Sequence, residues 1–373
     1  MGAWLLFLFA LVAGSVNAVT AQPIATVIVA AHNSSPSARS TADYVCDGNG
    51  DQEEINAALA SLPPAGGMVF LMEGTYDIRK VQGALGGLLI QRSHVTLAGA
   101  GAATRLVLAP HQNTNVIRII GRDVGNITIR DLLVDANREY NAEGKGDPKK
   151  SHDRFEFCGI KAFCGWPGES GESPTHDITV ENTTVRNAQR LGIMLEGLNM
   201  KVIGNTLGNA GSDVVELLTG PGEIRGNLVE ITGQTHVAIG SDCANSILMS
   251  DNIVHIKPGG RLDIAFRSWK GSQRHVIANN IVTVDSAGVC TQAIDARGSH
   301  TVITGNCLQS TNSAPLTRLT VSGGDALISD NVLENITIEI NDLSGENKPI
   351  ILGPNLLDNT AVDHKAGHLI RSH

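Results

Sequence analysis

Side chains that can transfer protons recur at equivalent positions in each of a series of short apolar segments. The segments read "GIKAF", "GIMLEG", "VVELL", "HVAIGSD", "LDIAFRSW" and "QAIDARG". If each is an extended strand, alternate side chains point to opposite faces. One face then carries the apolar residues Ile160, Ile193, Val215, Val237, Ile264 and Ile294. The other face carries Lys161, Met194, Glu196, Glu216, His236, Asp263, Arg267, Asp295 and Arg297.

Glu216, His236 and Asp263 are the most concentrated titratable group in this set. We expect them at adjacent outward positions on three successive segments. Like charges stacked about 5 Å apart raise the pKa of at least one carboxyl group, which produces a general acid. Solvated strand faces also carry charges without any function. The pattern nevertheless predicts proton transfer centred on Glu216.

The elements that carry these residues repeat along the chain. Each unit has a β-branched run that ends in Asn and is followed by another apolar pair, as in "HDITVENTTV" and "SQRHVIANNIV". The spacing of 22 to 28 residues is typical of a solenoid of short strands. Asn side chains stacked at the turns can satisfy buried turn groups by hydrogen bonding to each other. The predicted ladder consists of Asn182, Asn205, Asn227, Asn252, Asn280, Asn306 and Asn331.

One segment, "GDQEEINAALASLP", has a helical period, with Asp51 able to cap it. Because solenoid ends need caps, we expect this helix, near 51–62, to cover the N-terminal end. The N-terminal run "MGAWLLFLFALVAGSVNA" is typical of a secretory signal. We therefore divide the chain into a signal at 1–21, an N-terminal segment at 22–66, a solenoid at 67–355 and a tail at 356–373.

Composition excludes several classes of function. The formal net charge of −9 argues against nucleic acid and anionic membranes as partners. Six cysteines in 373 residues do not make a disulfide scaffold. Cys158 and Cys164 can pair in a secreted protein, or they are scattered buried thiols. We find no zinc-type His/Cys spacing and no acidic cluster to assign to calcium, so no metal or cofactor is expected.

One repeat is about twice the usual length, with 51 residues between Asp131 and Asn182. Loops beside a functional strand form the walls of a groove. Only 3% of the chain is aromatic, yet this region holds Tyr140, Phe155, Phe157, Phe163 and Trp166. Trp166, and Trp269 further on, are candidates for stacking on a sugar ring. The alternative is that the loop packs on its own aromatic side chains.

The repeats and the segment "TADYVCDGNGDQEEINAALASLPPAGGMVFLMEGTYDI" resemble the secreted right-handed parallel β-helix proteins of the pectate-lyase-like superfamily. The resemblance covers nearly everything after the signal. It implies an all-β, right-handed parallel β-helix solenoid and a polysaccharide or oligosaccharide ligand in a groove over one sheet. The chain has neither the motif series "NTD…DD…HG…RIK" of the polygalacturonases nor the motif "DPHE" of the mannuronan epimerases.

A narrower resemblance concerns Glu216. "VVELLTGPGEIRGN" with "VSGGDALISDNV" is similar to segments of the inulin fructotransferases, whose essential glutamate lies in the "VEL" strand. The resemblance carries that role to Glu216. The position of the family's partner aspartate is occupied here by Gly204, so the fructan reaction does not carry over with it.

Three hypotheses remain open. The first is a hydrolase or transferase of glycosidic bonds, with Glu216, Asp263 or Asp242 as the carboxylates and His236 in support. The second is a uronate lyase, in which Lys161, His236, Arg267 and Arg297 supply the base and the stabilising cation. The third is a non-catalytic glycan-binding solenoid. Substrate contacts are expected from Glu196, Asp242, Arg267, Trp269, Trp166, Lys161, Asp295 and Arg297.

Overall fold

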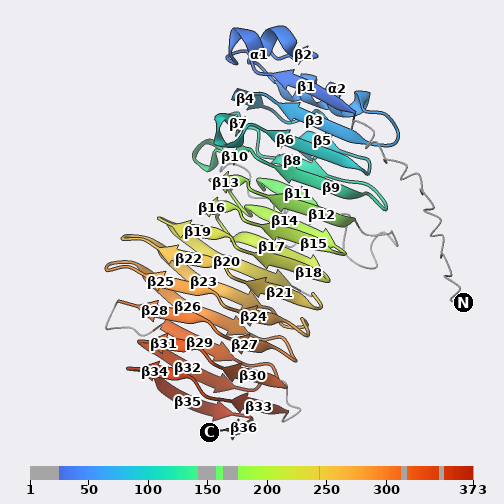
Figure 1. Cartoon of the computed structure of the whole chain (residues 1–373). Coiled ribbons are helices and arrows are strands. Elements are labelled where there is room, and N and C mark those ends of the chain that lie inside the picture. Colours follow the sequence, from blue (N-terminus) through green and yellow to red (C-terminus); the bar gives the residue numbers. More distant parts are fainter. Residues whose placement is uncertain are drawn as a thin grey trace, which may run out of the picture.

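The computed structural model describes residues 25–141, 157–162, 175–242, 244–311, 317–343 and 348–372. These residues form a single stack of coils that follows the order of the chain from the N-terminal to the C-terminal end (Figure 1). The predicted signal, 1–21, lies outside them, as do Phe155, Phe163, Cys164 and Trp166. Within the described ranges no helix has the length and apolar character needed to cross a bilayer.

From β3 onward, each coil contributes one strand to each of three parallel sheets, as the alternating short runs predicted. Among the described residues the first sheet has 14 strands and the other two have 11 each. The first contains β1 (Thr26–Ala30), β2 (Tyr44–Val45), β3 (Gly67–Leu71), β6 (Val95–Gly99), β9 (Gly125–Arg130), β12 (His176–Glu181), β15 (Met200–Ile203), β18 (Gly222–Arg225), β21 (Ile247–Ser250), β24 (Val276–Ala278), β27 (Val302–Thr304), β30 (Ala326–Ser329), β33 (Pro349–Leu352) and β36 (His368–Arg371).

The second sheet contains β4 (Gly74–Ile78), β7 (Thr104–Leu108), β10 (Leu133–Asp135), β13 (Thr184–Arg186), β16 (Thr206–Gly208), β19 (Leu228–Ile231), β22 (Ile253–Ile256), β25 (Ile281–Val284), β28 (Cys307–Ser310), β31 (Val332–Glu334) and β34 (Leu356–Asp358). The third contains β5 (Gly86–Ile90), β8 (Asn115–Ile119), β11 (Ile160–Ala162), β14 (Ile193–Gly197), β17 (Asp213–Thr219), β20 (Gln234–Asp242), β23 (Arg261–Ser268), β26 (Val289–Ala296), β29 (Thr317–Val321), β32 (Ile336–Asn341) and β35 (Ala361–Ala366). The chemistry-bearing segments of the sequence all lie on this third sheet.

A ladder of buried asparagines links the coils, as the repeat predicted. Each side-chain amide from Asn205 to Asn331 donates to the Oδ1 of the next asparagine at 2.9–3.0 Å, and the ladder continues to Asn355. The prediction was wrong for Asn182, which is exposed and has a φ of 44°. Its neighbour Thr183 takes the ladder position, since its N–H donates to Asn205 Oδ1. Asn tolerates that left-handed turn conformation, so the residue serves the turn instead.

Two α-helices precede the regular coils, α1 (Pro36–Thr41) and α2 (Gln52–Ser61). The predicted helix near 51–62 is α2, and it packs against first strands of all three sheets, which closes the N-terminal end of the core. Ile55, Leu59 and Leu62 enter that core. Asp51 stands at the N-cap position, but its carboxylate accepts from the N–H groups of Gly48 and Asp77 instead of capping the helix.

The solenoid extends beyond the predicted limits of 67 and 355. β1 pairs with β3 at the N-terminal end. Strands β34, β35 and β36 add one more coil from the segment that was expected to be a tail. The outermost strand of a parallel sheet has unpaired backbone N–H and C=O groups. A neighbouring segment with alternating apolar residues can pair with these groups, and the segments at both ends of the solenoid have such residues. Two short 3₁₀ turns lie within coils: Gly101–Ala103 connects β6 to β7, and Arg138–Tyr140 follows β10.

Candidate active site

One outward row crosses the third sheet from coil to coil. The strand registers place these residues side by side in the order Arg118, Lys161, Met194, Glu216, Gly240, Arg267 and Asp295. The outward placement of Lys161, Met194, Glu216, Arg267 and Asp295 is therefore as the sequence predicted. Lys161 is almost completely buried, at 1% exposure.

The expected stacking of His236 and Asp263 beside Glu216 was wrong. Gly240 takes the position next to Glu216 on β20, and Arg267 follows on β23. His236 and Asp263 instead pair with each other, Nδ1 to Oδ2 at 2.8 Å, and both side chains are about half exposed.

The cause is an interruption of the alternation within each strand. Ala238 and Ile239 of β20 are both part of the core, and so are Ala265 and Phe266 of β23. Val215 consequently pairs with Ile239, two residues beyond the expected Val237. By the same shift, Phe266 occupies the position expected for Ile264.

A buried acid pair lies on β17. Nη2 of Arg267 donates to Asp213 Oδ2 at 2.6 Å and to Glu216 Oε1 at 2.8 Å. Ser212 Oγ donates to the other oxygen of Asp213 at 2.9 Å. Exposure is 2% for Asp213, 5% for Glu216 and 7% for Arg267. A charge-assisted network of this kind is much stronger in a dry site than at the surface.

Gly240 leaves room for this network. Arg267 belongs to β23, whereas both acids belong to β17, so its side chain must cross the intervening strand β20. A Cβ atom at Gly240 would lie 3.2 Å from Asp213 Oδ2 and 3.5 Å from Arg267 Nε. The missing side chain therefore leaves the space in which the guanidinium reaches the acid pair.

The electrostatics of the pair favour a retained proton. Burial raises the pKa of Glu216 well above its usual range, the charge of Asp213 raises it further, and Arg267 opposes both effects. Burial also raises the pKa of Asp213, against the influence of Arg267 and of the Ser212 hydrogen bond. A carboxyl group that stays protonated at higher pH than its neighbours is a potential general acid.

Asp295 and Arg297 continue the row beyond Arg267. Arg297 Nε contacts both carboxylate oxygens of buried Asp295, at 3.0 and 2.9 Å. The Cζ atoms of Arg297 and Arg267 lie 4.4 Å and 5.2 Å from the centre of the Trp269 ring. The Trp269 ring thus flanks the guanidinium that binds the acid pair, and its stacking on a sugar stays a prediction.

Glu196 and Asp242 lie in a second row, two residues further along the strands, on either side of Leu218. Asp242 is partly exposed, and its negative charge also raises the pKa of Glu216. Of the aromatic group in the long coil, Tyr140 is half exposed and Phe157 is buried. Cys158 is buried, and Cys164, its candidate disulfide partner, lies outside the described residues.

A hollow of about 410 Å³ lies beside the acid pair, lined by Arg138, Gln189, Arg190, Gly211, Ser212 and His236. Backbone hydrogen bonds link lining residues of successive coils: Ser212 N–H donates to Arg190 O, and His236 N–H donates to Ser212 O. Ser212 joins the hollow to Asp213 through its hydroxyl.

Sequence reasoning missed Asp213 and the two arginines of the hollow. Simple alternation from Val215 directs Asp213 into the core, where an unpaired carboxylate would be very costly. That conflict was the available signal that the strand starts irregularly. Arg138 and Arg190 lie in turns, and no periodicity in the sequence predicts where a turn residue points.

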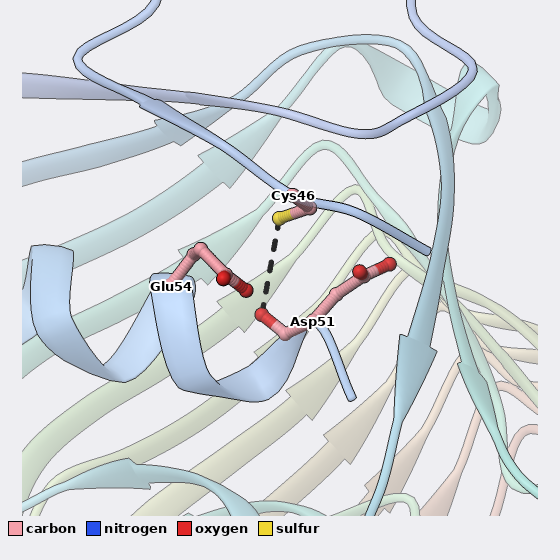
Figure 2. A group of neighbouring side chains, drawn as sticks. All are labelled: Cys46, Asp51 and Glu54. Atoms are coloured by element: carbon pink, nitrogen blue, oxygen red, sulfur yellow. Dashed lines mark hydrogen bonds between the residues drawn. The ribbon is translucent and has the colours of Figure 1, made fainter. Parts of the chain in front are cut away.

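Cys46, Asp51 and Glu54 form a second group of potential metal ligands, near the start of α2 (Figure 2). The thiol of Cys46 faces the main-chain carbonyl of Asp51 at 3.9 Å, and the Asp51 carboxylate turns away to accept two backbone N–H groups. Burial raises the pKa of the Cys46 thiol far above its usual range. The Cys46 thiol and the Asp51 carboxylate thus bind neighbouring backbone at the start of α2, and we interpret their role as structural.

No protein-family model matches the chain. The structure is similar to that of DFA-IIIase from Arthrobacter chlorophenolicus A6, with a TM-score of 0.54, 14% identity, and 86% of this chain and 83% of that chain covered. In sequence, 153 residues are 29% identical to mannuronan C5-epimerase AlgE4 of Azotobacter vinelandii, which covers 38% of this chain and 24% of that protein. A further match, over 158 residues at 27% identity, is to alginate lyase 7 of the same organism, covering 40% of this chain and 17% of that protein.

The chain thus spans no more than about a quarter of the length of the curated relatives it matches. The structural similarity, at 14% identity, concerns the fold. Together with the three parallel sheets, it shows that the chain is a right-handed parallel β-helix protein with a capped N-terminal end.

Proposed function

We propose that this protein is an enzyme that cleaves or transfers glycosidic bonds in a polysaccharide or oligosaccharide, with Glu216 as the general acid. The observation that carries the proposal is the buried Asp213–Arg267–Glu216 network with its raised carboxyl pKa values. An ordinary charged residue on a strand is solvated. Burial of a carboxyl group beside a charged partner, which shifts its pKa, is typical of a group that must hold a proton at neutral pH.

In this mechanism the proton of Glu216 passes to the glycosidic oxygen as the bond to the sugar carbon breaks. Asp213 positions Arg267 and, through its own charge, keeps the pKa of Glu216 high. Asp242, which is partly exposed and whose charge acts on Glu216, is the second carboxylate in this proposal. Water or a sugar hydroxyl as acceptor then decides between hydrolysis and transfer.

The printed names of similar structures support a sugar substrate. DFA-IIIase has been solved in complex with GF2 and, as a mutant, in complex with DFA-III, and these structures share the fold at TM-scores of 0.51 and 0.50. Both are oligosaccharide ligands. An oligosaccharide on the third sheet of the present chain would lie over the row that contains Glu216.

A second candidate function is β-elimination on a uronate polymer. The local sequence similarity to an enzyme named alginate lyase 7 and to a mannuronan C5-epimerase favours it. His236, oriented by Asp263 through Nδ1, would be the base, since a partnered imidazole presents its second nitrogen to a substrate. Arg267 or Lys161 would stabilise the charge that develops on the uronate.

A product assay separates the candidates. The purified protein is incubated with neutral glycans and with uronate polymers, and new reducing ends and ultraviolet absorbance are followed together. Glycosidic hydrolysis gives reducing ends, transfer gives new oligosaccharides seen by chromatography, and neither product absorbs. β-Elimination gives an unsaturated, absorbing uronate. Binding without any product would leave the non-catalytic alternative and refute both enzymatic candidates.

A further inference from the structure

The hollow beside the acid pair contains two cationic side chains that no acidic group of the described residues neutralises. Within the described residues, Arg138 and Arg190 form no ion pair, whereas Arg186 and Arg225 do, with Asp135 and Glu223. The contrast is notable in a chain with a formal net charge of −9. A guanidinium without a carboxylate partner is a ready site for an anion.

Individual atoms of the hollow also lack partners. Arg190 Nε and Gln189 Oε1 are buried and have no hydrogen-bond partner among the described residues. Buried polar atoms are nearly always paired, so an unpaired donor and an unpaired acceptor in one hollow indicate a ligand that offers both kinds of group. A sugar acid offers a carboxylate to the donor and hydroxyls to the acceptor.

Arg138 reaches over Gly211 at the edge of the hollow. A Cβ atom on Gly211 would lie 3.5 Å from Arg138 Nη2 and would collide with the carbonyl of Gln189 at 1.9 Å. The guanidinium of Arg138 therefore lies next to the turn that leads into β17. On that turn Ser212 donates to Asp213, which shares Arg267 with Glu216.

We propose that the hollow is a subsite for an acidic sugar unit, whose carboxylate is bound by Arg138 and Arg190 while Gln189 Oε1 accepts from one of its hydroxyls. The volume of about 410 Å³ is within the usual range of small-ligand sites. Planar guanidinium groups match the two oxygens of a carboxylate. This subsite deepens the proposed function, on which it rests: the substrate of Glu216 is a uronate-containing glycan, with the acidic unit next to the reacting bond.

Calorimetric binding of short oligouronates tests the subsite. The background is Glu216→Gln, so that turnover is slow during the titration, and the comparison ligands are the carboxyl-reduced, neutral oligomer and a sulfated oligosaccharide. We expect the oligouronate to bind at least about tenfold more tightly than the neutral oligomer, and Arg138→Gln or Arg190→Gln to remove about tenfold of that affinity each, the change that corresponds to 1.4 kcal/mol. Binding of the neutral oligomer should not change in either variant.

Arg225→Gln is the matched control, because Arg225 lies on the first sheet and loses the same charge there. Arg190→Lys, which keeps the charge and the fold of the turn, should recover part of the affinity. Equal binding of the acidic and neutral oligomers, tighter binding of the sulfated one, or equal losses in the Arg225 control would overturn the proposal. A fully active Glu216→Gln enzyme would refute the proposed mechanism and leave the binding results to decide the subsite separately.

Discussion

Replacing Asn227 with leucine tests how the coils are held together. Asn227 is 1% exposed, and its Oδ1 accepts from both the N–H and the Nδ2 of Asn205 at 2.9 Å. Its own Nδ2 donates to Val202 O and to Asn252 Oδ1, also at 2.9 Å. Leucine has a similar size but makes none of these hydrogen bonds. The substitution leaves the backbone N–H and one Nδ2 hydrogen of Asn205 buried without an acceptor, while the other Nδ2 hydrogen keeps Val180 O.

A stranded buried donor costs about 1–3 kcal/mol, so Asn227→Leu should lower the free energy of unfolding by about 2–6 kcal/mol in total. Urea denaturation followed by circular dichroism measures it. The matched control is Asn49→Leu, at an exposed position whose φ is outside the left-handed region, where a change within about 0.5 kcal/mol is expected. Equal effects of the two substitutions would refute the reasoning that the buried ladder, and not asparagine in general, stabilises the coils.

Three further predictions concern the site. Gly240→Ala should lower turnover at least about tenfold and cost about 1–3 kcal/mol of stability, because its Cβ crowds Asp213 and Arg267. The control Gly208→Ala, on the second sheet, should have a mild effect, and equal kinetics of the two variants would contradict the prediction. The raised pKa of folded Glu216 means that the folded protein binds more protons than the unfolded chain between the ordinary value of 4.5 and the folded value. Stability should therefore fall as pH rises through that window, and urea titrations of Glu216→Gln should lack this part of the fall. Trp269→Ala should weaken substrate binding up to about tenfold by removing cation–π contacts worth roughly 0.5–2 kcal/mol, and an unchanged calorimetric Kd would show that the ring does not help to position Arg267.

The repeat was sufficient to predict the architecture. The period, the turn asparagines and the one helical segment led to the parallel coils and to the cap formed by α2. These features depend on local patterns that each coil repeats, so a single sequence contains many copies of the same information. The exception at Asn182 shows the limit, because one turn shifts the ladder position to Thr183 without changing the pattern of apolar residues.

The site was only partly predictable for a related reason. Glu216 and Arg267 were assigned to one outward row, and they are in that row. Their direct contact depends on the absence of a side chain at Gly240 and on two consecutive core residues in β20 and β23, which shift His236 and Asp263 away from Glu216. Such irregularities within a strand come from packing against neighbouring coils and leave no periodic signal.

The most direct test of the central claim is the steady-state turnover of Glu216→Gln compared with that of His236→Gln, on whichever glycan the wild-type protein degrades. Glutamine keeps the size of Glu216 and can still contact Arg267 but holds no transferable proton. We predict a fall in kcat of roughly 10²–10⁴-fold for Glu216→Gln, with circular dichroism unchanged, and a much smaller effect for His236→Gln. Nearly full activity of Glu216→Gln, with the loss concentrated in His236→Gln, would contradict the account and favour elimination with His236 as the base.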